Sequence, residues 1–123
     1  MKSYIDLEQS KKLAEILPIE SADMEYMFLK KDNSKVSNVP FVKDDDEPEW
    51  PDDGSYDFIP CWSLTALLSV LPRVDIEKEI YSDDTYEYRV KAYIDDGYVG
   101  DWFDNPIDAC YNMIIELHKD KLL

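Results

Sequence analysis

The side chains best suited to nucleophilic or proton-transfer chemistry in this chain are two cysteines and one histidine. Cys61 stands just ahead of a leucine-rich segment that predicts a helix, and the exposed amide groups at a helix N-terminus lower the pKa of a thiol. His118, the one imidazole base of the sequence, lies near the chain end. No glycine-rich elbow or oxyanion motif accompanies Cys61. We therefore expect a thiol that packs beside Trp62, keep a reactive Cys61/His118 pair as the alternative, and assign no catalytic residue.

Carboxylates are abundant, but their spacing does not fit a metal site. Neither Asp44-Asp45-Asp46-Glu47 nor Asp52-Asp53-Gly54 has the alternating ligands and distal glutamate of a calcium-binding loop. One histidine and two distant cysteines make no zinc pattern either. The 3 glycines of the chain exclude a glycine-rich loop that cradles phosphate. We expect no metal and no cofactor.

A further group of side chains combines bases with large aromatic rings. The strand pattern between residues 85 and 103 places most of them on one face of a predicted hairpin, and aromatic rings with arginine are typical of binding surfaces. This face is a candidate interaction surface, extended by a tryptophan of the acidic segment. The interpretation that the sequence favours is that residues 1–43 cover this face as a second core layer and that the tryptophan only anchors its own loop. The candidate surface consists of Arg89, Lys91, Tyr93, Tyr98, Trp102 and Trp50.

The charge of the chain is strongly acidic and unevenly distributed. Lys and Arg number 13 against 28 Asp and Glu, which gives a net charge of -15. Residues 44–72 hold eight acids and no base, and residues 73–108 hold eleven acids and four bases. Such a surface repels phosphate backbones and anionic lipids, so we expect neither direct nucleic-acid binding nor membrane attachment. Proline, glycine and charge repulsion predict an acidic loop at about residues 44–57.

Length and composition predict a single α+β domain over residues 1–123. A chain of 123 residues, 45% of them hydrophobic, can build one core. No apolar run approaches the roughly 18–20 residues that span a bilayer, and the first residues lack the pattern of a secretory signal. Two cysteines make no disulfide framework and suit reduced, buried thiols. We therefore expect a cytoplasmic protein.

The predicted fold is a mainly antiparallel sheet with two or three helices, and its second half is ordered helix, strand, strand, strand, helix. Hydrophobic periodicity, capping residues and prolines define the elements. Helices are expected at about 6–17, 59–72 and 106–119, the last capped by Asn105. Strands are expected at about 21–30, 35–43, 74–81, 85–95 and 98–103.

Two turns set the predicted strand registers. Asp96-Gly97 suits a two-residue type I′ turn, which places Ile94 opposite Val99 and Val90 opposite Phe103, with all four on the helix-covered face. At residues 83–84 a regular two-residue loop would put Ile80 opposite a glutamate. We therefore predict an odd loop or a bulge, which moves Ile76 and Ile80 to the face of Tyr86, Tyr88 and Val90.

The chain resembles uncharacterised proteins of gut-bacterial genomes and their phages or mobile elements. The residues that carry the resemblance are Ile59-Pro60-Cys61-Trp62-Ser63-Leu64 through Leu71-Pro72, Asn105-Pro106-Ile107-Asp108-Ala109-Cys110 through Leu117, and the early stretch from Leu17 to Met24. That family has no assigned activity, so the resemblance implies a bacterial or phage source and no catalytic residues.

These observations predict a non-enzymatic accessory or regulatory protein that acts through a protein partner, and they leave its oligomeric state open. The first alternative is an acidic mimic of nucleic acid, which would need a double row of carboxylates at intervals of about 6–7 Å, the spacing of phosphates. The second alternative is a cysteine-dependent enzyme that uses Cys61.

Overall fold

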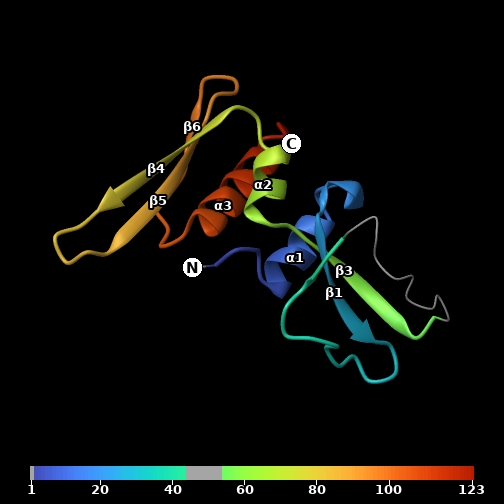
Figure 1. Ribbon diagram of the computed structural model, residues 1–123. Helices are drawn as coiled ribbons and strands as arrows, with labels where there is room; N and C mark the ends of the chain where they lie inside the picture. Colours follow the sequence, from blue (N-terminus) through green and yellow to red (C-terminus); the bar gives the residue numbers. More distant parts are fainter. Residues whose placement is uncertain (1, 44–53) are drawn as a thin grey trace. The chain divides into compact units, whose positions relative to one another are not determined.

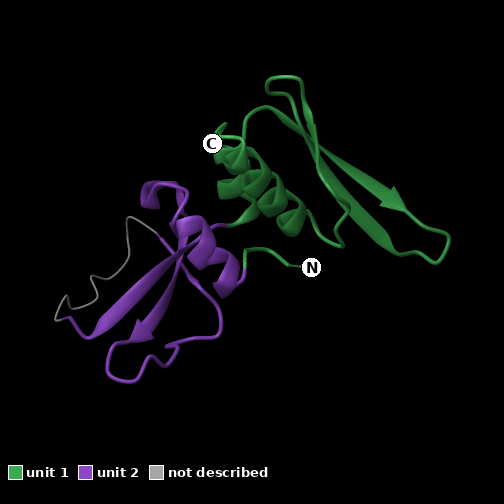
Figure 2. Cartoon of the chain, turned by 180° about the vertical axis from the view of Figure 1, so that it is seen from behind, with its two compact units in different colours: residues 1–5, 63–123 green, residues 6–62 purple. Residues whose placement is uncertain are grey.

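The structure is a computed structural model that describes residues 2–43 and 54–123. Its chain divides into two compact units, which Figure 2 colours separately: unit 1 comprises residues 1–5 and 63–123, and unit 2 comprises residues 6–62. The described residues form three α-helices and two three-stranded antiparallel sheets, so the predicted α+β class is confirmed. None of the described helices is long and apolar enough to cross a membrane.

Unit 2 is a small sheet with one helix packed on it. Asp6 caps α1 through a reciprocal capping box with Gln9, and the helix ends well before Pro18. The predicted hairpin partner of β1 is reduced to a two-residue edge strand, because Pro40 lacks the N–H that an interior strand needs. The sheet has the order β2-β1-β3. Its elements are α1 (Leu7–Ala14), the 3-10 turn η1 (Ile19–Ser21), β1 (Met24–Leu29), β2 (Phe41–Val42) and β3 (Tyr56–Cys61).

The segment that contains Cys61 is a strand, where the sequence predicted the start of a helix. β3 pairs with β1 along its whole length, with Cys61 opposite Met24 and Pro60 opposite Glu25. Pro60 is tolerated because β3 is an edge strand. The helical leucine pattern begins later, after Ser63, whose hydroxyl accepts a hydrogen bond from the Ala66 amide. The predicted helix over 59–72 is therefore too long at its N-terminal end.

Unit 1 has the predicted order of helix, three strands and helix (Figure 1). Its sheet has the order β4-β5-β6, so β4 is an edge strand, and α3 packs on β5. The elements are α2 (Leu64–Val70), β4 (Val74–Ile80), β5 (Tyr86–Ala92), β6 (Tyr98–Val99) and α3 (Pro106–Lys119).

The predicted irregular turn between β4 and β5 is confirmed. Ile76 pairs with Val90 and Ile80 with Tyr86, so these side chains share one face of the hairpin. The Tyr81 amide donates to the Thr85 carbonyl at 2.9 Å, and the loop contains a residue at positive φ, Asp84 at 65°. We call the face that carries Ile76, Ile80, Tyr86 and Val90 the helix-side face, because α3 packs on it, and the opposite one the outward face.

The predicted register between β5 and β6 is wrong. Val99 lies opposite Lys91, where the sequence placed Ile94, and it is 63% exposed on the outward face. The turn is longer than two residues: Asp95 and Gly97 have positive φ, and the Gly97 amide donates to the carbonyl of Ile94. The Asp-Gly pair therefore closes a wider loop and not a type I′ turn.

Helix α3 has the bounds that the sequence predicts. The Asn105 side chain accepts a hydrogen bond from the Asp108 amide at 2.8 Å and donates to the Asp104 and Asp108 carboxylates. Pro106 occupies the first turn, and Lys2 forms an ion pair with Asp108 at 2.8 Å. The predicted apolar stripe is buried, and it consists of Cys110, Met113, Ile114 and Leu117.

We expect Asn105→Ala to lower the free energy of unfolding by about 1–2 kcal/mol, because the Asp108 amide at the start of α3 loses its acceptor. Asn105→Ser keeps an oxygen at the cap and should cost less. Urea unfolding of the wild type and both variants measures the difference. Equal stabilities of all three proteins would show that this cap is dispensable.

Candidate functional site

The outward face of the β4–β5 hairpin carries a cluster of charges centred on Glu77. Its carboxylate forms ion pairs with Nε of Arg89 at 2.6 Å and with Nζ of Lys91 at 2.7 Å. Hydrogen bonds from these two bases hold the pKa of Glu77 below its usual range. All three side chains are about one-third exposed, so the cluster links β4 to β5 at the surface of unit 1.

Two aromatic rings of the predicted interaction surface join this cluster. The guanidinium of Arg89 lies 4.6 Å from the ring centroid of Trp102, a cation–π distance. The Tyr93 hydroxyl donates to the Asp75 carboxylate at 2.6 Å, and this bond raises the pKa of Tyr93. The structure therefore brings together four of the predicted surface residues, Arg89, Lys91, Tyr93 and Trp102.

Tyr98, a further member of the predicted surface, does not join them. Tyr98 pairs with Ala92 and so belongs to the helix-side face, where its hydroxyl donates to Asp120 at 2.7 Å. That bond raises the pKa of Tyr98 to about 12. The change of side follows from the wrong register of β6. Trp50 and most of the predicted acidic loop lie outside the described residues, and Tyr56 and Asp57 at its end belong to β3.

A surface that the sequence did not reveal lies at the loop end of the same hairpin. Ile76, Ile80 and Tyr86 are 39%, 61% and 45% exposed, although they continue the face on which Tyr88 and Val90 are buried. Lys78 lies between the two isoleucines, with Nζ 4.2 Å from the ring centroid of Tyr86. We call Ile76, Lys78, Ile80 and Tyr86 the hairpin end. The sequence shows the alternation of these side chains but not where α3 stops covering the sheet.

The two candidate residues of a cysteine enzyme belong to different units and show no activation. Cys61 is buried in unit 2 at the end of β3, and burial raises the pKa of its thiol to about 11. The raised pKa is the opposite of the lowered pKa that the alternative of a reactive thiol at a helix start requires. His118 in unit 1 is exposed, and Nδ1 lies 3.0 Å from the Leu123 carbonyl oxygen.

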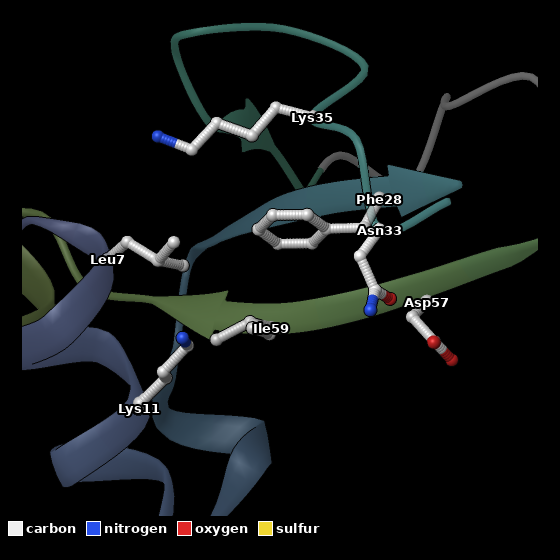
Figure 3. A pocket seen from close by; sticks show the side chains of 7 residues that line it. All are labelled: Leu7, Lys11, Phe28, Asn33, Lys35, Asp57 and Ile59. Carbon is white, nitrogen blue, oxygen red and sulfur yellow. The ribbon is translucent and has the colours of Figure 1, made fainter. Parts of the chain in front are cut away.

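Unit 2 also contains an open cavity of about 480 Å³ (Figure 3). Its centre is apolar, with Leu7 and Ile59 beside the ring of Phe28, and Lys11 and Lys35 lie on opposite sides. The lining charges are partly engaged, since Lys11 forms an ion pair with Glu8 and Asp57 forms one with Lys30. Such a cavity can accommodate an apolar group, but it brings no nucleophile and base together. The remaining lining residue is Asn33.

The carboxylates of β4 can be compared with the two rows of negative charge that a nucleic-acid mimic requires. Asp75, Glu77 and Glu79 alternate along the outward face, which puts them about 7 Å apart. The neighbouring positions on β5 are Lys91, Arg89 and Glu87, so the second row is mainly basic. Within residues 2–43 and 54–123, no three metal-ligating side chains lie close enough to hold an ion.

Compared with family models, with curated proteins and with solved structures, the chain matches none. A function must therefore rest on the geometry of the described residues.

We expect both thiols to be inert in the folded protein. At a pKa of about 11, about one Cys61 side chain in a thousand is ionised at pH 8, and the pKa of Cys110 is raised further, to about 12, by burial. Reaction with a chromogenic disulfide reagent should be slow in buffer and complete in guanidinium chloride. Fast native reaction of one thiol that Cys61→Ala removes would contradict this and favour the enzyme alternative.

We expect the Glu77 cluster to make stability sensitive to acid. Because the folded protein lowers the pKa of Glu77 from 4.5, its contribution is present above that pH and is lost as the pH falls through the folded-state pKa. Glu77→Gln should therefore reduce the loss of stability below pH 4.5. Glu79→Gln, one pleat away and opposite Glu87, is the matched control. Identical acid unfolding curves for Glu77→Gln and the wild type would rule the contribution out.

Proposed function

We propose that this chain is a non-catalytic accessory or regulatory protein that works through protein–protein contacts, with the β4–β5 hairpin as its contact element. The observation that carries the proposal is the hairpin end. Ile76, Ile80 and Tyr86 follow the face of the sheet that forms the core of unit 1, yet no described helix covers them. An apolar group on a rigid, charged surface is the usual mark of a protein contact site.

The position of the hairpin end explains why it is uncovered. Tyr88 pairs with Phe103. Helix α3 begins at Pro106, shortly after Phe103 in the chain, and runs back along the sheet. Strand positions beyond Tyr88 therefore extend past the start of the helix, as both views of unit 1 show (Figures 1 and 2). The hairpin is held rigidly by β4–β5 pairing over 7 residues of each strand. A rigid arm with exposed apolar side chains needs little ordering when it binds.

The position of Lys78 is consistent with a reversible protein contact. Its ammonium group lies 4.2 Å from the Tyr86 centroid and 5.8 Å from the Tyr88 centroid, so it places a charge over the apolar side chains in the free protein. Charged residues on exposed strands keep such surfaces from aggregating. A partner has to displace this lysine or accommodate it, which favours a selective interaction.

The same hairpin gives less support to nucleic-acid mimicry. A mimic needs two rows of carboxylates, and β4 supplies one row while β5 sets Lys91 and Arg89 beside it. Two buried free cysteines, Cys61 and Cys110, are consistent with the cytoplasmic location that is part of this proposal. The proposal also keeps the bacterial or phage source that the sequence resemblance implies.

We expect a photo-crosslinking phenylalanine derivative in place of Tyr86, in cells that naturally carry this protein, to capture one defined partner. Ile80→Glu should abolish the capture, because it buries a charge at the centre of the contact. Ile19→Glu in unit 2 is the matched control, since Ile19 is 58% exposed and Ile80 61%. Capture is measured by mass spectrometry of the crosslinked product.

The proposal fails under either of two results. In the first, Tyr86 gives no specific product. In the second, the product forms equally with the wild type, Ile80→Glu and Ile19→Glu, which would mean that the hairpin end does not select the partner. Circular dichroism of the variants checks that each remains folded, as the exposure of both isoleucines predicts.

A further inference from the structure

One long edge of unit 1 has no strand beside it. β4 runs for 7 residues, and β5 is the one strand that pairs with it in the part of the chain that the structure describes. An edge strand of this length is a template for a further strand, because its outer backbone groups remain available for hydrogen bonding.

The register of β4 against β5 shows which backbone groups face outward. The Tyr93 amide donates to the Arg73 carbonyl at 2.8 Å and the Tyr81 amide to the Thr85 carbonyl at 2.9 Å, so odd-numbered residues on this side of the hairpin bond to β5. In an antiparallel pair the intervening residues point their N–H and C=O groups the other way. The free edge therefore presents the backbone groups of Ile76, Lys78 and Ile80.

The side chains of β4 specify what an added strand must carry. On the outward face it would meet Asp75, Glu77 and Glu79, all acidic. Glu79 lies directly opposite Glu87, so this end of the row has no base across the hairpin. On the helix-side face the added strand would meet Ile76 and Ile80, with the aliphatic part of Lys78 between them. A strand that alternates lysine or arginine with apolar residues complements both faces.

A second copy of β4 is a poor occupant of this edge. If two copies pair antiparallel with their apolar faces aligned, every outward pair is formed from Asp75, Glu77 and Glu79, so acid lies opposite acid in each register. If the copy is turned over to bring Lys78 near Glu77, the isoleucines of one copy face the acids of the other. The charge pattern thus opposes self-association through this edge.

We infer that β4 binds an extended segment of a partner protein in which basic and apolar residues alternate, and that this segment adds a fourth strand to the sheet of unit 1. The inference rests on the proposed function and specifies its partner. Backbone hydrogen bonds to Ile76, Lys78 and Ile80 supply affinity, and Glu79, which has no base across the hairpin, selects the basic residues.

The test uses the whole chain and a synthetic 7-residue peptide, as long as β4, in which lysine and valine alternate. Amide exchange followed by NMR should show that the peptide protects the amides of Ile76, Lys78 and Ile80, while those of Glu77 and Glu79, already bonded to β5, change little. Glu79→Lys should weaken the binding of this peptide and strengthen the binding of a peptide in which glutamate and valine alternate. Glu8→Lys, an exposed change on α1, should do neither.

Two further peptides test the backbone contacts without altering the protein. One carries N-methyl groups on the backbone nitrogens of its lysines and the other on the backbone nitrogens of its valines. The methyl groups therefore face β4 in one peptide and point away from it in the other. One of the two should bind at least about tenfold more weakly than the parent, the loss expected from missing backbone hydrogen bonds, while the other binds normally.

The inference is overturned if both methylated peptides bind like the parent, if protection appears away from β4, or if the free chain is a dimer whose β4 amides are already protected. It also falls if a cellular partner crosslinks through Tyr86 while the β4 amides stay unprotected. In that last case the proposed function stands and the strand addition does not, so the two failures are distinguishable.

Discussion

The packing of α3 on the helix-side face of β5 is the interaction on which the rest of unit 1 depends. It buries Tyr88, Val90 and Ala92 on the strand together with the apolar stripe of the helix. Gly100 permits the close approach, because a Cβ atom there would lie 3.2 Å from the Val90 carbonyl oxygen and 3.4 Å from Cε of Met113. Since the chain turns into α3 just after the level of Tyr88, the helix covers one part of the hairpin and leaves the rest uncovered.

One strand pattern therefore produces two different environments. Where α3 lies on the sheet, alternating apolar residues form a core. Beyond it, Ile80 and Tyr86 keep the same alternation and become surface, with Lys78 over the aromatic ring. The ion pairs of Glu77 with Arg89 and Lys91 are partly exposed, so their contribution to stability is modest, and they join the two strands laterally. Past the end of α3 the hairpin continues through the pairing of β4 with β5.

The sequence predicted the elements whose signals are local and missed those set by distant pairing. α3 was predicted to its bounds because Asn105, Pro106 and a helical apolar stripe mark it within a few residues. β3 was missed because its strand character comes from pairing with β1, about 30 residues earlier in the chain. The register of β6 failed because Asp95 and Gly97 close a wider loop than the Asp-Gly pair suggests. That error also misplaced Tyr98, whereas Trp102 stays on the outward face, where it contacts Arg89. No sequence pattern shows where a helix stops covering a sheet.

The placement of charge along the hairpin follows from the same geometry. Asp75 and Glu77 are satisfied within the hairpin, by Tyr93 and by two bases. Toward the loop the compensation ends: Glu79 lies opposite Glu87, and Asp83 and Asp84 follow in the turn. The uncompensated acids are thus concentrated where the apolar side chains lose their helix. An isolated apolar end would favour pairing between copies, but a cluster of like charges beside it penalises every copy that approaches. The same cluster attracts basic side chains, so the arrangement of charge that opposes pairing between copies of β4 is also the one on which the proposed strand addition rests.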